Sequence, residues 1–189
     1  MLQIPHRGFN MPAIYLLTII LFSFSSSLSF ATEPQIILGA GAYGMKLKHS
    51  PQGLPDNDFG GRFFAEHTQN NFAGSRFILY NIDNDDVSVP GGEIQLLLGY
   101  GLAHNGVRIY TGPTWHIEHI HLPRENGSTK SSTLKGWAWQ VGTGVQYKAF
   151  GIDYAFGLRA NQSYKDENRR VGNPNGNMYT HSILLSYRF

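Results

Sequence analysis

Histidine, serine and carboxylate side chains are the residues of this chain that could perform hydrolysis. A nucleophilic serine needs a histidine within hydrogen-bond reach to accept its proton, and an acidic residue to orient that histidine. His181 and Ser182 are adjacent, but neighbouring residues of a strand point to opposite faces. The stretch Asn161-Gln162-Ser163, followed by Glu167, has an asparagine where the base is needed. Because asparagine is not a base at neutral pH, we predict no catalytic residue.

Two clusters carry side chains of the kinds that bind metal ions. One is rich in histidine and the other is acidic: His116, His119 and His121, and Asp83, Asp85 and Asp86. On a strand, His116 points inward beside Glu118 while His119 and His121 point outward, which leaves fewer histidines together than a zinc site needs. The acidic cluster lacks the glycine and the distal glutamate of a calcium-binding loop. We therefore predict no metal and no cofactor, and expect these rim residues to contact solvent.

Alternation of apolar and polar residues predicts the elements that carry these side chains. In the last segment Ile183, Leu185, Tyr187 and Phe189 share one face, and the intervening residues share the other. Eight such segments can be delimited: Gln35–Lys46, Phe59–Thr68, Ser75–Ile82, Gly92–His104, Val107–Ile120, Leu134–Lys148, Gly151–Tyr164 and Asn177–Phe189. Most are as long as strands that cross a bilayer at a tilt, about 9–11 residues. In the first and third segments the alternation leaves the facing open, because residues 76–80 are large on both faces.

Short and long connections alternate along the chain. The short ones are Asn70–Gly74, His104–Gly106 and Ala149–Gly151, and the long polar ones are Leu47–Asp58, Asp83–Gly91, His121–Thr133 and Lys165–Gly176. Asn105-Gly106 is a favoured pair for a type I′ hairpin turn. Aromatic residues gather at both ends of the segments: Tyr100, Tyr147, Tyr154, Tyr187 and Phe189 near the turns, and Trp115, Trp137, Tyr164 and Tyr179 near the loops. This pattern predicts an all-β fold, an eight-stranded antiparallel up-and-down transmembrane β-barrel.

The polar face of such a barrel would line an interior just wide enough for side chains. Nine charged residues are predicted to form a network of ion pairs there: Arg62, Glu66, Glu93, Arg108, Glu118, Lys148, Asp153, Arg159 and Arg188. Five cations face four anions, and pairing is required because an isolated buried charge costs several kcal/mol. We expect a plugged lumen, with a narrow channel as the alternative.

Basic residues are placed in or beside the third and fourth predicted loops. They are Arg124, Lys130, Lys135, Lys165, Arg169 and Arg170. At the outer surface of a membrane such cations can pair with the phosphates of lipopolysaccharide through charge-assisted hydrogen bonds. They can equally contact a protein partner or keep the loops soluble.

Residues 1–31 have the features of a secretory signal peptide, with an apolar stretch over residues 13–24 and small residues at Ser29 and Ala31. That stretch is shorter than the roughly 20 residues of a spanning helix, so an uncleaved anchor is the less favoured alternative. Cleavage near Ala31 leaves a barrel domain over residues 32–189 with 14 basic and 13 acidic residues. This balance and the absence of cysteine argue against nucleic-acid binding, disulfide scaffolds and thiol catalysis.

Three motifs near the C-terminus resemble those of the Ail/Lom/OmpX family of small outer-membrane barrels. They are Gly144-Val145-Gln146-Tyr147, Ile152-Asp153-Tyr154 and the closing Ser186-Tyr187-Arg188-Phe189, in which Ser186 replaces the family's glycine. The resemblance covers about the last 55 residues and is architectural before Gly92. It implies an eight-stranded outer-membrane barrel. We expect the barrel to be a monomer in contact with lipid and lipopolysaccharide. In some members the loops bind host-surface or serum proteins, but no such contact residue can be transferred.

The aromatic C-terminus has the form of an assembly signal. Tyr187 and Phe189 end the chain on the apolar face and are expected to be recognised by the barrel-insertion machinery of the bacterial outer membrane. Three functions stay open at this point. The first is a non-enzymatic surface protein for adhesion, serum resistance or envelope integrity. The alternatives are an enzyme that modifies lipid A, as a deacylase or acyltransferase, and a narrow channel.

Overall fold

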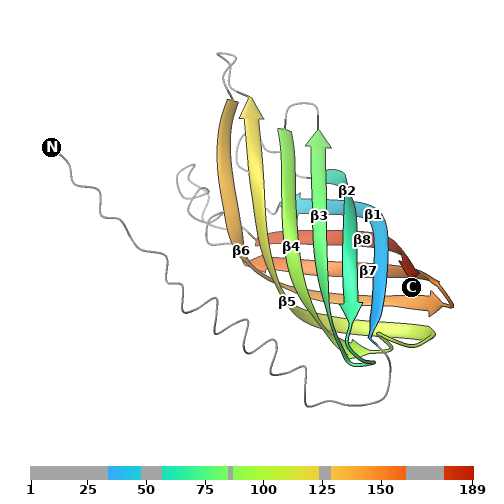
Figure 1. Ribbon diagram of the computed structural model, residues 1–189. Helices are drawn as coiled ribbons and strands as arrows, with labels where there is room; N and C mark the ends of the chain where they lie inside the picture. The colour runs from blue at the N-terminus through green and yellow to red at the C-terminus, as the bar shows by residue number, and fades with distance from the viewer. Residues whose placement is uncertain (1–33, 48–56, 85–86, 124–128, 161–176) are drawn as a thin grey trace. The chain divides into compact units, whose positions relative to one another are not determined.

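The computed structural model describes residues 34–47, 57–84, 87–123, 129–160 and 177–189. They form eight strands: β1 Gln35–Leu47, β2 Asn57–Thr68, β3 Ala73–Asn84, β4 Val87–Tyr100, β5 Gly106–Pro123, β6 Thr129–Tyr147, β7 Phe150–Ala160 and β8 Asn177–Arg188. Each strand pairs antiparallel with its neighbours in sequence, and β8 returns to β1 to close a barrel (Figure 1). The predicted fold class is confirmed. Over these described ranges, no helix is long and apolar enough to span a membrane.

The two ends of the barrel differ in their connections. At one end, called the turn end, residues 69–72, 101–105 and 148–149 join successive strands and β8 ends at Arg188. The opposite end is called the loop end. There β5 and β6 are the longest strands, with 18 and 19 residues, and their pairing runs on to Pro123↔Thr129. The pairing of β6 with β7 stops earlier, at Trp137↔Ala160, so the β5–β6 hairpin extends past its neighbour (Figure 1).

The two faces of each strand have opposite environments. In β8 the exposed fractions of Ile183, Leu184 and Leu185 are 54%, 1% and 61%, so alternate residues point out of the barrel and into it. The facing that the sequence left open is decided here: Arg76, Ile78 and Tyr80 of β3 point inward. Large apolar side chains cover the outer face on all eight strands, as on a barrel that spans a membrane.

Aromatic residues predicted at the strand ends lie on this outer face. Tyr100, Tyr147, Tyr154, Tyr187, Phe189 and Trp137 are exposed, Trp115 and Tyr179 are half-buried, and Tyr164 lies outside the described residues.

The prediction of a long loop over Asp83–Gly91 is wrong. β3 continues to Asn84 and β4 begins at Val87, and the two ends pair as Asn84↔Val87. Pro90 lies within β4 although it cannot donate a backbone hydrogen bond. Pro90 pairs with Asn81 of β3, while the register between β4 and β5 has no pair at residues 89 and 90. The proline is thus accommodated where one of its two ladders is interrupted.

The turn between β4 and β5 also differs from the prediction. Gly106 has a positive φ of 113°, but Asn105 does not, so Asn105-Gly106 is not a type I′ turn. The strand ends at Tyr100 and the turn takes five residues, beginning at Gly101 with φ 79°. Alternation along the predicted segment Gly92–His104 would place Leu102 on the same face as Tyr100, but Leu102 is completely buried against Leu97 and Tyr110. The longer turn gives this apolar side chain room to fold into the turn end of the lumen.

Candidate functional site in the barrel lumen

Nearest the turn end, two arginines and two carboxylates form a ring of ion pairs. Arg76 Nη2 lies 2.6 Å from Glu66 Oε2 and 3.1 Å from Asp153 Oδ2. Arg108 closes the ring, with 2.5 Å from its Nη2 to Glu66 Oε1 and 3.6 Å from its Nε to Asp153 Oδ1. Tyr110 lies at the ring and accepts a hydrogen bond of 3.1 Å from Arg76. We call these four ions the turn-side ring.

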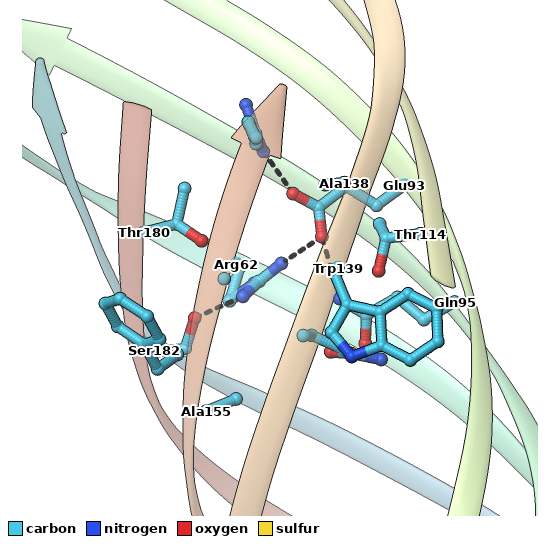
Figure 2. Close-up of a pocket in the computed structure, with 13 residues that line it drawn as sticks. Arg62, Glu93, Gln95, Thr114, Ala138, Trp139, Ala155, Thr180 and Ser182 are labelled. Carbon is cyan, nitrogen blue, oxygen red and sulfur yellow. Dashed lines mark hydrogen bonds and ion pairs between the residues drawn. The ribbon is translucent and has the colours of Figure 1, made fainter. Parts of the chain in front are cut away.

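Nearer the loop end, two more arginines and two carboxylates form a chain of ion pairs. Arg62 contacts Glu93 at 2.9 Å, Glu93 also pairs with Arg159, and Arg159 contacts Glu118 at 2.9 Å (Figure 2 shows the Arg62 and Glu93 part). The other terminal nitrogen of Arg62, Nη1, donates a hydrogen bond to the hydroxyl of Ser182. The hydroxyl of Tyr80 donates to Glu118 at 2.7 Å, and His116 lies 4.0 Å from the same carboxylate. We call these four ions the loop-side chain.

The charges of these two groups cancel, with two cations and two anions in each. All eight side chains are at most 4% exposed, so each must have a partner to offset the loss of water. Tyrosine rings supply further contacts: Arg62 lies 4.6 Å from the ring centre of Tyr43, and Arg159 lies 5.5 Å from that of Tyr80. Side chains therefore fill the interior at two levels along the barrel axis.

The structure places some members of the predicted nine-residue network in the lumen networks and others outside them. Seven of its members lie in the ring and the chain: Arg62, Glu66, Glu93, Arg108, Glu118, Asp153 and Arg159. Two do not. Lys148 is exposed at the tip of the β6–β7 turn with φ 52°, and its ammonium lies 5.5 Å from the ring centre of Tyr147. Because Lys148 belongs to a turn, the inward and outward alternation of a strand does not apply to it.

Arg188 is the second exception. Its guanidinium group donates hydrogen bonds to several segments at the turn end. It donates to the side chain of Gln35, to the backbone and side chain of the β4–β5 turn at Ala103 and Asn105, and to the carbonyl of Lys148 in the β6–β7 turn. The last strand thereby links β1 with two turns that follow different strands. These contacts and the buried Leu102 close the lumen at this end.

Sequence reasoning missed Arg76 and three buried tyrosines, Tyr43, Tyr80 and Tyr110. Arg76 follows Ser75 on a strand whose two faces are both bulky, so its facing was open. One signal could have found it. Glu66 and Arg76 lie at similar distances on either side of a short turn, and cross-strand partners share a face.

The residues considered for catalysis do not assemble in the described part of the chain. His181 is exposed on the outer wall, where Nδ1 lies 2.6 Å from the hydroxyl of Tyr154, while Ser182 is buried in the lumen against Arg62. His181 and Ser182 thus point apart, as expected. Asn161, Ser163 and Glu167 lie outside the described residues.

The candidate metal ligands are similarly dispersed. His116 is buried in the lumen, and His119 is exposed with its Nδ1 2.9 Å from the hydroxyl of Thr133. The described residues contain no group of three potential metal ligands. Asp83 is exposed, while Asp85 and Asp86, together with the side chain of His121, lie outside what the structure describes.

Of the basic residues considered for lipopolysaccharide or partner contact, Lys135 is exposed near the loop end of β6, and Lys130 belongs to the extended β5–β6 hairpin. Arg124, Lys165, Arg169 and Arg170 lie outside the described residues. At the other end Tyr187 and Phe189 are exposed, with their rings edge-on at 4.9 Å.

No protein-family model matches the sequence, and no curated protein matches it either. The fold is nevertheless similar to solved barrels. One is Ail, the attachment invasion locus protein of Yersinia pestis, in complex with the heparin analogue sucrose octasulfate; the identity is 14%, the match covers 84% of this chain and 100% of Ail, and the TM-score is 0.57.

Two further solved barrels are similar at the same level. The N-terminal barrel domain of Pseudomonas aeruginosa OprF is 9% identical and matches over 83% of this chain and 100% of its own, with a TM-score of 0.58. Neisserial surface protein A is 14% identical and matches over 81% of this chain and 95% of its own, with a TM-score of 0.56. At these identities the likeness concerns the fold, and at that level it agrees with the resemblance to the Ail/Lom/OmpX barrels.

Proposed function

We propose that this chain is a monomeric bacterial outer-membrane barrel, without catalytic activity, whose loop end faces the outside of the cell and contacts a partner there. The observation that carries the location is the outer face, where large apolar side chains are exposed on every strand. Exposure on this scale is unfavourable in water, and it suits a surface covered by lipid chains. Under this proposal residues 1–31 are a signal peptide and the aromatic C-terminus serves insertion.

The lumen supports a role that does not depend on transport. Eight charged side chains pair across the interior, and Leu102 and Arg188 close the turn end. Opening a continuous pore would require breaking buried ion pairs, at a cost of about 3–5 kcal/mol for each arginine removed from its partners. A barrel of this kind acts through its surface.

The loop end offers the surface for such contact. The β5–β6 hairpin extends past the end of its pairing with β7, and its polar strand residues include Lys130 and Lys135. The similar barrel Ail is named for attachment and invasion and was solved with a sulfated sugar. By analogy with that protein, we propose that the partner is a host-surface or serum component, and that basic residues at the loop end favour an anionic one.

A shortened hairpin tests this function. His119 and Thr133 are cross-strand partners, so replacing residues 120–132 by Asn-Gly gives a two-residue hairpin turn. It removes the outer β5–β6 pairs and the pair Ser88↔His121, but keeps the other β4–β5 pairs and all β6–β7 pairs. The variant and the unchanged protein would be refolded and screened for binding to serum proteins, matrix proteins and heparin. We expect the variant to lose binding while it keeps the heat-dependent gel migration of a folded barrel. Unchanged binding would contradict the proposed surface.

Two measurements separate the alternatives. Mass spectrometry of lipid A from cells with and without the protein would show a gained or lost acyl chain only for an enzyme. Planar-bilayer recordings would show a stable single-channel conductance only for a channel. We expect neither signal.

A further inference from the structure

A small cavity lies in the lumen between the ring and the chain of ion pairs. Its polar lining includes Arg62, Gln95, Thr114 and Gln140, and its apolar lining includes the small side chains of Ala138 and Ala155 (Figure 2). On β5, Thr114 lies between Arg108 of the turn-side ring and Glu118 of the loop-side chain. The free volume is about 10 Å³. That is close to the space required by one water molecule.

Polar atoms without a protein partner surround this cavity. They are Arg62 Nε, Gln95 Oε1, Thr114 Oγ1, and both Oε1 and Nε2 of Gln140. All four residues are 3–4% exposed. The side-chain nitrogen of Gln95, Nε2, is engaged, because it donates to Glu93 at 2.8 Å. Buried polar atoms are nearly always hydrogen-bonded, so several of them around one cavity indicate a ligand that both donates and accepts.

We propose that this cavity is a binding site for one water molecule, held by Gln140, Gln95, Thr114 and Arg62. Water offers two donors and two acceptors, and the lining provides two nitrogen donors, two amide oxygens and one hydroxyl. Buried waters make about three hydrogen bonds. The site goes beyond the proposed surface function, because it lies inside the barrel and would persist whatever the loop end binds.

The charges around the cavity favour a neutral ligand over an ion. Arg62, Glu93 and Arg159 line it, and with Glu118 they form the balanced loop-side chain. An added ion would bring an unbalanced charge into the interior, where a buried charge costs several kcal/mol. A larger neutral molecule does not fit the volume.

The sign of one stability change tests the proposal. Thr114→Val replaces a hydroxyl by a methyl of nearly the same size. If water is bound, the valine variant loses a hydrogen bond and its urea unfolding midpoint falls. If the cavity is dry, the hydroxyl of Thr114 is a buried group without a partner, and removing it raises the midpoint. Thr114→Ser is the matched control, because it keeps the hydroxyl.

Direct detection completes the test. In protein labelled at glutamine and held in lipid nanodiscs, the side-chain NH₂ of Gln140 should show a nuclear Overhauser cross-peak to a long-lived water. The cross-peak should persist in Thr114→Ser and weaken in Thr114→Val. Its absence from the unchanged protein, or a raised midpoint in Thr114→Val, would overturn the proposal.

Discussion

The turn-side ring and the loop-side chain contain the same four charges but connect them differently. In the ring, both Arg76 and Arg108 contact both Glu66 and Asp153, so each carboxylate has two cationic neighbours. In the chain, Arg159 bridges Glu93 and Glu118, and among the described ion pairs Arg62 reaches Glu93 alone. In the ring, two arginines connect the two carboxylates, whereas in the chain Arg159 is the one arginine that contacts both carboxylates. We therefore expect position within a network, more than burial, to decide how much one arginine contributes to stability.

The largest loss of stability is expected when the loop-side chain of ion pairs is interrupted at Arg159. Arg159→Met removes the bridge between Glu93 and Glu118, together with the hydrogen bonds from Arg159 to Tyr43 and Tyr80. We expect a loss of about 5 kcal/mol in the free energy of unfolding, the upper end of the range for breaking a buried ion pair. Urea unfolding followed by tryptophan fluorescence measures it, since Trp137 and Trp139 are exposed on the outer wall. Lys46→Met, which removes an exposed cation, is the control.

A smaller effect is expected in the ring. Arg76→Met leaves Arg108 in contact with both Glu66 and Asp153. The expected loss is about 3 kcal/mol, the lower end of the same range. Urea unfolding followed by tryptophan fluorescence measures this loss as well. If Arg76→Met costs as much as Arg159→Met or more, the distinction between ring and chain is wrong.

Outside both networks the effect should be smaller again. Arg188→Gln removes donors to Ala103, Asn105 and Lys148, at a site that is only half-buried and where water can replace some of the bonds. We expect a loss of about 1–2 kcal/mol. Hydrogen exchange at backbone amides of residues 101–105 should accelerate, while that of the loop-side strand ends stays unchanged. Uniform acceleration along the barrel would show that Arg188 does not act locally.

The smallest effect is expected from a double substitution that restores the charge balance. Combining Arg159→Met with Glu118→Gln removes one cation and one anion and leaves the pair of Arg62 and Glu93 intact. Because replacing both members of a buried ion pair is often close to neutral, most of the stability should return, to within about 1 kcal/mol of the unchanged protein. No recovery in the double variant would mean that the loss in Arg159→Met comes from packing and not from uncompensated charge.

Much of the barrel follows from local patterns in the sequence. Alternation fixed the number of strands and the outward facing of Ile183, Leu185 and Tyr187, because the side-chain period of a strand is two whatever its neighbours are. It failed where local rules give no answer. Arg76 lies on a strand with bulky residues on both faces, the long polar stretch Asp83–Gly91 suggested a loop, and Lys148 and Arg188 lie where strands end.

The pairing of charged side chains within the lumen also goes beyond what local patterns predict. The sequence predicted that inward charges would pair, because burying an isolated ion is too costly. It could not assign partners. Arg62 on β2 meets Glu93 on β4, and Arg159 on β7 meets Glu118 on β5, so neither pair joins strands that are neighbours in the barrel. Such contacts depend on the register and tilt of several strands at once.

Taken by itself, the sequence determined the closed all-β architecture, the apolar outer face and the need for the inward charges to pair, since each depends on residue type and a spacing of two. Only the tertiary structure decided which ions meet, which of them form a ring and which a chain, how Leu102 and Arg188 close one end, and where polar atoms surround a cavity. These features arise across the barrel, between residues that no short-range pattern relates.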